Sequence, residues 1–181
     1  MADTRVWQLE MLSNLLGVTG NFGVKEDSSK EGTPVWSKWD GSGVVKGSAC
    51  IATCLGRTSS RDKSVFSHDP QEAALIDQWL EYKVSYLDRC TSEKDLHNAL
   101  QELNGYLSDR VYLVTSHMTL ADLVLYYGLY DTMKGLTFYE KERFIHLSRW
   151  FNNVQHEEKI SENLAMIVFQ RNLLYSVCGL A

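Results

Sequence analysis

The stretch from Met118 to Tyr130 most constrains how this chain of 181 residues can fold. Between Asp122 and Asp131 every residue is apolar or aromatic except Gly128, and no charged side chain interrupts the run. A helix that is hydrophobic on all sides has to be buried on all sides. The stretch therefore predicts a central buried helix with an all-helical domain packed around it.

The start of this predicted helix carries two local signals. Thr119 can cap the helix, and Asp122 can accept a hydrogen bond from the Thr119 backbone N–H, which together make a capping box. Met118 before the cap and Leu123 in the first turn can pack on each other as a hydrophobic staple. Because buried helix N–H groups cannot bond to water, we interpret Asp122 as a structural carboxylate rather than a general base. Its replacement by Ala is expected to cost about 1–2 kcal/mol.

The first part of the chain predicts a small mixed domain, residues 1–57. The apolar spacing of Asp3 to Leu16 indicates an amphipathic helix. Residues 17–32 favour a loop around one weak strand, and residues 34–45 favour a hairpin with a Gly-containing turn. Ser48 is expected to cap the helix that follows.

Residues 58–68 are polar and mixed in charge, and they predict a linker. Residues 69–181 then predict a bundle of helices. Its expected helix starts are Asp69, Ser92, Thr119, Thr137, Ser148 and Ser161. The fold class is therefore α+β, with a reduced mixed N-terminal half and an all-α C-terminal half.

Composition argues against several classes of function. Eighteen basic against 23 acidic residues give a net charge of −5, whereas direct nucleic-acid binding usually requires a basic surface. The aromatic residues lie at helical spacing and favour the core over a base-stacking role. No apolar run is long enough for a membrane span, and the N-terminus lacks the order of a signal peptide.

Metal and cofactor sites are not expected either. Cys50 and Cys54 lie one helical turn apart, but no second pair or histidine at ligand spacing accompanies them. We interpret them as small packing residues with free thiols in a cytoplasmic protein. The five histidines are scattered, without a Cys–His or Ser–His–Asp arrangement. No catalytic residue is assigned.

A set of short segments carries a resemblance to a known family. They are Gln78-Trp79-Leu80-Glu81-Tyr82, Asn104-Gly105-Tyr106-Leu107, Val111-Tyr112-Leu113, Thr119-Leu120-Ala121-Asp122, Leu123 through Leu129, and Ser148-Arg149-Trp150-Phe151. Together they closely resemble the elongation factor 1 epsilon type of auxiliary protein in the multi-aminoacyl-tRNA synthetase complex, within the glutathione-transferase-like superfamily. The resemblance covers residues 69–175 well and the first part of the chain faintly.

The resemblance implies a reduced thioredoxin-like N-terminal half and a glutathione-transferase C-terminal-like half. It also implies a non-catalytic scaffold in support of translation. The implied partners are methionyl-tRNA synthetase and glutamyl-prolyl-tRNA synthetase, bound through their own glutathione-transferase-like domains. The implied location is the cytoplasm and, by the same resemblance, the nucleus.

A degenerate glutathione-binding enzyme is the alternative, and a subunit of the elongation factor 1 complex is a weaker one. A glutathione transferase needs a thiolate-stabilising group after its first strand, and this chain begins with a predicted helix instead. Pro34 fits the position of the transferase proline. Gly47-Ser48 lies where an acid- or amide-plus-serine pair would grip glutathione, and Gly47 offers no side chain for it.

Domains of this superfamily commonly pair through the N-terminal hairpin with its following helix and through the first long C-terminal helix. In this chain those segments are Val44 to Leu55 and Asp69 to Leu87. We expect methionyl-tRNA synthetase to dock there. Glu81 and Lys83 are the expected exposed contact residues of the long helix.

A second partner site is expected around Arg149 and Asn153. With Ser148 as cap, Arg149 would be the first residue of its helix, where the helix dipole disfavours a cation. A local salt bridge with Glu140 or Glu142 would compensate for it. The functional alternative is an acidic residue of a partner domain, which the resemblance makes that of glutamyl-prolyl-tRNA synthetase.

Overall fold

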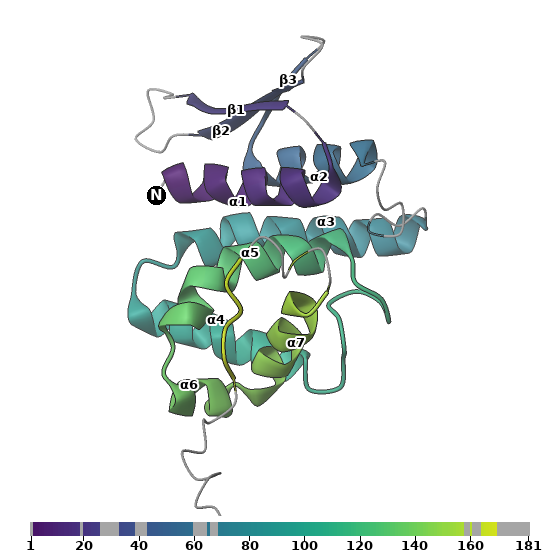
Figure 1. The fold of residues 1–181 in the computed structure, drawn as a ribbon. Coiled ribbons are helices and arrows are strands. Elements are labelled where there is room, and N and C mark those ends of the chain that lie inside the picture. Colours follow the sequence, from purple (N-terminus) through teal and green to yellow (C-terminus); the bar gives the residue numbers. More distant parts are fainter. Residues whose placement is uncertain are drawn as a thin grey trace, which may run out of the picture.

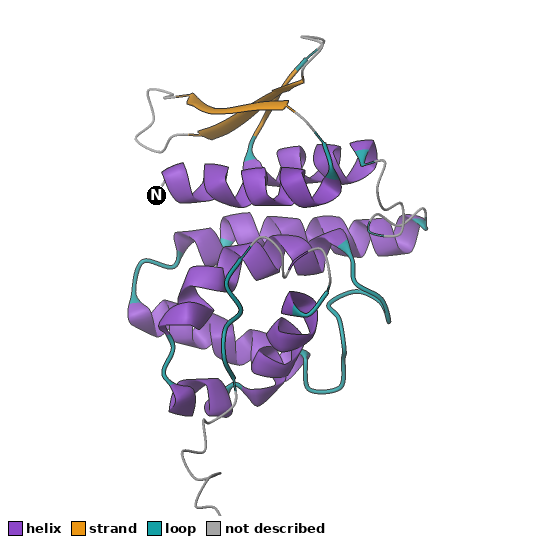
Figure 2. Cartoon of the chain, viewed as in Figure 1, coloured by secondary structure: helices purple, strands orange, loops and turns teal. Residues whose placement is uncertain are grey.

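The computed structural model describes residues 2–18, 20–25, 33–38, 43–59, 65, 69–157, 160 and 164–169. Figure 1 shows its layers: a small sheet lies over the helices α1 and α2, and these lie over a bundle formed by the later helices. Figure 2 shows the same division, with all strands at one end of the molecule. No helix in the described part is long and apolar enough to cross a membrane.

The N-terminal half contains two helices and three strands. They are α1 (Ala2–Leu16), β1 (Gly20–Lys25), β2 (Thr33–Lys38), β3 (Val44–Lys46) and α2 (Ser48–Thr58). The sheet order is β1-β2-β3 and both pairings are antiparallel, with Trp36 opposite Val45 in the β2–β3 pair. Pro34 and Trp36 are buried toward the helices, whereas Val35 and Ser37 are half-buried, as the alternation of a strand requires. The predicted helix, weak strand and antiparallel pairing of the hairpin are confirmed, and residues 39–42 of the predicted turn lie outside the described residues.

The expected cap of α2 is wrong by one residue. Gly47, not Ser48, occupies the N-cap position, and its φ of +88° lies in the left-handed region that favours glycine. Ser48 is already the first residue of the helix.

The C-terminal half contains five α-helices and a short 3₁₀ helix in its described part. They are α3 (Pro70–Ser85), η1 (Leu87–Arg89), α4 (Glu93–Tyr106), α5 (Leu120–Gly135), α6 (Phe138–Arg143) and α7 (Ile145–Gln155). The N-cap residues of α3, α4, α5 and α6 are the predicted Asp69, Ser92, Thr119 and Thr137. The capping box of α6 is present, with Glu140 accepting from the Thr137 N–H at 2.8 Å.

The predicted start of α7 is wrong. The helix begins at Ile145, and Ser148 lies inside it with its hydroxyl donating to the Lys141 carbonyl at 2.8 Å. The first N–H groups of α7 are satisfied from another helix: Asn104 Oδ1 accepts from His146 N at 2.9 Å and from Leu147 N at 3.1 Å. Because α4 supplies this cap, the helix needs no local capping residue.

The helix expected to start at Ser161 is not observed over residues 164–169, and residues 161–163 lie outside the described residues. Residues 165–169 have no regular secondary structure. The Gln155 side chain holds this segment, because it accepts from Ile167 N at 3.0 Å and donates to Ile167 O at 2.9 Å. One side chain thereby takes both backbone groups of Ile167 away from any helical pairing.

The helix α5 is the centre of the fold, as its sequence predicts. From Leu120 to Tyr130 every residue except Gly128 is buried, and the helix contacts α1, α2, α3 and α7. A Cβ at Gly128 would lie 2.9 Å from Lys83 Cε, so any other residue here would have to displace the end of that side chain. Fully burying one Leu side chain contributes about 1.5–3 kcal/mol, so this helix supplies a large part of the folding free energy.

The predicted linker contributes two buried residues to the packing. The Ser59 hydroxyl donates to the Leu16 carbonyl at 3.0 Å, and the Val65 carbonyl accepts from Leu120 N at 2.9 Å. Val65 therefore provides an acceptor for one of the N–H groups at the start of α5 that have no partner within the helix. Residues 60–64 and 66–68 of the linker lie outside the described residues. The division at 57 and 69 stays a prediction.

Candidate functional site

Asp122 is fully buried at the start of α5 and accepts four hydrogen bonds. Its Oδ2 accepts from the Thr119 N–H at 2.9 Å and from the Thr119 hydroxyl at 2.8 Å. Its Oδ1 accepts from Leu113 N and from Trp150 Nε1, each at 2.9 Å. Burial raises the pKa of this carboxyl group, and the four donors oppose that rise.

The predicted bond from Asp122 back to the Thr119 N–H is confirmed. Asp122 does more than cap, because it joins the loop at Leu113 and the helix α7 to the start of α5. With both oxygens occupied and no exposure to solvent, it holds the bundle together and has no access to a substrate. Leu123 is buried and Met118 packs against the same core. A direct contact between these two side chains stays a prediction.

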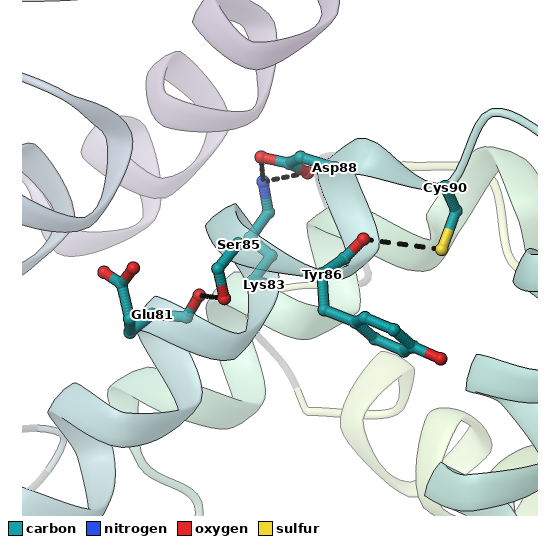
Figure 3. Close-up of polar contacts among 6 residues, drawn as sticks. All are labelled: Glu81, Lys83, Ser85, Tyr86, Asp88 and Cys90. Carbon is teal, nitrogen blue, oxygen red and sulfur yellow. Dashed lines mark hydrogen bonds and ion pairs between the residues drawn. The ribbon is translucent and has the colours of Figure 1, made fainter.

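Lys83 is not the exposed contact residue that the sequence suggested. It is 3% exposed, and its Nζ donates to both oxygens of Asp88 at 3.0 Å. Figure 3 shows this pair beside the end of α3, with the lysine directed toward η1. Burial lowers the pKa of Lys83, and the Asp88 carboxylate opposes that change. Lys83 is therefore part of the interior, where it fills the space beside Gly128.

Glu81, two residues earlier, has the exposure expected of a contact residue. Figure 3 shows its carboxylate directed away from Lys83, while its backbone carbonyl accepts from the Ser85 hydroxyl at 2.7 Å. It belongs to what we call the α2–α3 surface, which consists of six of the exposed side chains of β3, α2 and α3. These are Val44, Cys50, Ala74, Leu75, Gln78 and Glu81.

A hydrogen bond joins α2 and α3, the two helices of this surface. Thr53 of α2 donates to Asp77 Oδ1 of α3 at 3.4 Å, and β3 contacts α2. Leu75 is 44% exposed and Val44 is 59% exposed. Large apolar side chains beside polar and charged ones are the usual composition of a protein–protein contact.

The Arg149 guanidinium is hydrogen-bonded within the chain. Its partners are neither the expected Glu140 or Glu142 nor an acidic residue of a partner domain. Its Nη2 donates to the Leu107 carbonyl at 2.7 Å and to the Arg110 carbonyl at 2.9 Å. It is the fifth residue of α7 rather than the first, because the helix begins at Ile145. The predicted dipole conflict is therefore absent. A role of Arg149 and exposed Asn153 in partner binding stays a prediction.

In the segment that corresponds to a glutathione-binding site, Gly47 has no side chain that could bind the γ-glutamyl group. Pro34 lies in β2, and its carbonyl accepts from Gly47 N at 3.0 Å. The first turn of α2 has no side-chain cap, so its N–H groups are not presented together with an acidic or amide side chain. Among the described residues no group of three or more His, Cys, Asp or Glu could hold a metal ion.

Known sequences that match this chain include a translation factor and a tRNA ligase. A protein named eukaryotic translation elongation factor 1 epsilon-1, from Cricetulus griseus, is 37% identical over 169 residues, which cover 93% of this chain and 95% of that protein. The bifunctional glutamate/proline–tRNA ligase of the same species is 28% identical over 178 residues, which cover 88% of this chain and 11% of the ligase. A family model described as nuclear-export cofactor Arc1p matches residues 72–158.

Comparison with solved structures confirms the fold. A glutathione S-transferase from Pseudomonas fluorescens superposes with a TM-score of 0.66, covering 87% of this chain and 92% of that chain. Its sequence identity is 20%, so the likeness shows the fold alone. The predicted α+β, glutathione-transferase-like fold is correct.

Proposed function

Because the chain belongs to the eukaryotic translation elongation factor 1 epsilon-1 family, we propose that it is a non-catalytic adaptor of aminoacyl-tRNA synthetases. It pairs its glutathione-transferase-like fold with equivalent domains of those enzymes and so supports translation. The observation that carries the proposal is the family relationship over 93% of the chain.

Similarity to a small part of a synthetase gives the partner class. The match to the glutamate/proline–tRNA ligase involves only 11% of that enzyme, so one segment of the ligase is similar in sequence to 88% of this chain. Domains of one fold often associate through equivalent surfaces. Synthetases that carry such a domain are therefore the partners we propose.

The α2–α3 surface is the proposed docking site for methionyl-tRNA synthetase. It combines the exposed Leu75 and Val44 with the exposed carboxylate of Glu81. Glutamyl-prolyl-tRNA synthetase is the second proposed partner, and Arg149 with Asn153 is the proposed contact. The adaptor acts in the cytoplasm, and by family resemblance also enters the nucleus.

Titration calorimetry with the isolated glutathione-transferase-like domain of methionyl-tRNA synthetase tests the first contact. Glu81→Lys should weaken binding at least 10-fold, about 1.4 kcal/mol, because a reversed charge meets groups arranged for the opposite sign. Glu102→Lys, on the exposed side of α4, is the matched control and should bind as the parent does. Parental affinity of the Glu81→Lys protein would place the contact elsewhere.

Glutathione is the ligand that separates the adaptor from the transferase alternative. The adaptor proposal expects no saturable binding in the micromolar range, because Gly47 has no side chain to hold the γ-glutamyl group. The same calorimetric cell can be loaded with glutathione and then with the synthetase domain. Tight glutathione binding together with no synthetase binding would overturn the proposal.

A further inference from the structure

A small cavity lies between the two halves of the chain, behind the α2–α3 surface. Residues from α1, α2, α3 and α5 line it, and the polar ones include Gln8, Ser48, Lys83 and Tyr127. Its volume is about 10 Å³. A cavity needs roughly 10–15 Å³ of such volume to hold one water molecule, so the space suits a single small ligand.

Two polar atoms on the wall of this cavity have no partner among the described residues. They are the Gln8 carboxamide oxygen and the Tyr127 hydroxyl, and both atoms are buried. Tyr127 as a whole is 1% exposed. Buried polar groups in folded proteins are almost always hydrogen-bonded, to protein or to ordered water. Two such groups on one cavity indicate a ligand that bonds to both.

The unpartnered groups of the cavity favour a neutral ligand. Two cations, Arg5 and Lys83, also line it, and both oxygens of Asp88 lie 3.0 Å from Lys83 Nζ, which balances the ammonium charge of the lysine. The two unpartnered groups are themselves uncharged. The wall of the cavity is mostly apolar, and an apolar ligand would leave both of these groups unsatisfied, whereas one water molecule can bond to both.

We propose that one ordered water molecule binds in this cavity and bridges the two halves of the chain. It donates a hydrogen bond to Gln8 Oε1 on α1 and accepts one from the Tyr127 hydroxyl on α5. The bridge is a binding site built into the fold, and it stabilises the contact between the N-terminal half and the helical bundle. It is independent of any partner on the surface outside.

The sign of a stability change tests the bridge. Tyr127→Phe keeps the ring and removes only the hydroxyl, so a bridging water loses a partner and the folding equilibrium constant should fall roughly 5-fold. If the cavity were dry, the same substitution would remove an unsatisfied buried group, and stability would be unchanged or would rise. Urea unfolding of the full chain distinguishes these two outcomes.

Tyr82→Phe is the matched control. The Tyr82 hydroxyl is also buried without a partner among the described residues, but Tyr82 does not line this cavity. Its replacement should leave stability unchanged or raise it. Equal losses in both variants would show that the effect does not belong to the cavity, and would overturn the proposal.

A crystal structure of the parent chain tests the water directly. The expected result is a density peak within about 3.2 Å of both Gln8 Oε1 and the Tyr127 hydroxyl. An ordered structure without that peak would contradict the bridge, whatever the stability data show.

Discussion

The charged groups inside the helical bundle and those on the α2–α3 surface differ in what they bond to. Inside, Asp122 accepts four hydrogen bonds and Lys83 pairs with Asp88. On the surface, no hydrogen bond or ion pair joins the Glu81 carboxylate to the described residues. Interior charge is therefore committed to structure, whereas the Glu81 carboxylate is available to a partner.

Glu81 and Lys83 show how small a sequence difference separates the two regions. Residues two apart on a helix point to different sides, whereas residues three or four apart share a face. Lys83 lies on the side of Ile76 and Leu80, which are both buried. The comparison predicts that interior substitutions change stability and that surface substitutions change binding.

The largest expected effect belongs to Asp122→Ala. Four donors lose their acceptor, two of them from outside the capping box, so the free energy of unfolding should fall by about 3–5 kcal/mol. The sequence-based value of about 1–2 kcal/mol counted the cap alone. Urea unfolding measures the loss. Asp131→Ala, an exposed acid on the same helix, is the control and should change stability by less than about 0.5 kcal/mol. Equal losses of stability in the Asp122→Ala and Asp131→Ala proteins would contradict the difference between buried and exposed charges.

Lys83→Met should have the next largest effect. The substitution keeps an apolar stem of similar length but leaves Asp88 without its cation. We expect a loss of about 2–3 kcal/mol, below the roughly 3–5 kcal/mol of a fully buried pair, because the Asp88 side chain is 16% exposed. Lys94→Met, on the exposed side of α4, is the control for removing a lysine charge. A Lys83→Met protein as stable as its control would show that the pair contributes little.

The pH dependence of stability should carry the signature of the same lysine. Burial lowers the pKa of Lys83 in the folded chain below the ordinary value of 10.5. Between these two pKa values the unfolded chain binds more protons, so this group makes stability rise as pH increases. The rise should be absent in Lys83→Met. Identical pH profiles of parent and variant above neutrality would contradict the lowered pKa.

Arg149→Ala should have a smaller effect on stability. It removes two hydrogen bonds to main-chain carbonyls, and the residue is exposed, so we expect a loss of about 1–2 kcal/mol. Asn153→Ala, one turn along the same exposed side, should cost less than about 0.5 kcal/mol. If Arg149→Ala instead keeps its stability and loses only partner binding, the residue belongs with the surface group.

The smallest expected stability effect is that of Glu81→Lys. An exposed carboxylate without a partner among the described residues can be reversed with a change within about 0.5 kcal/mol, even though binding of a synthetase domain should fall. Thermal unfolding of the variant without partner measures this. A large loss of stability would show that Glu81 also has a structural role.

Local signals in the sequence predicted the fold well. The caps at Ser92, Thr119 and Thr137 were correct because each depends on residues within one turn. The apolar run after Asp122 predicted the central helix because total burial leaves no alternative.

Contacts between distant residues were not predictable in the same way. Asn104 caps α7 from 42 residues away, and Trp150 donates to Asp122 from 28 residues away. Gln155 binds both backbone groups of Ile167 and so prevents the helix that the apolar spacing favoured. Burial of Lys83 was missed because lysine is almost never fully buried unless it is paired, and Asp88 gives no local sign of the pairing.

Hydrogen–deuterium exchange of the chain, free and bound to a synthetase glutathione-transferase-like domain, tests the central claim most directly. The account predicts slower exchange in peptides of α2 and in the first turns of α3, because partner contact there excludes water. The start of α5, already protected by the bonds to Asp122, should be unchanged. Slower exchange confined to α7 and the loop near Leu113, or no change anywhere, would contradict the α2–α3 surface as the docking site.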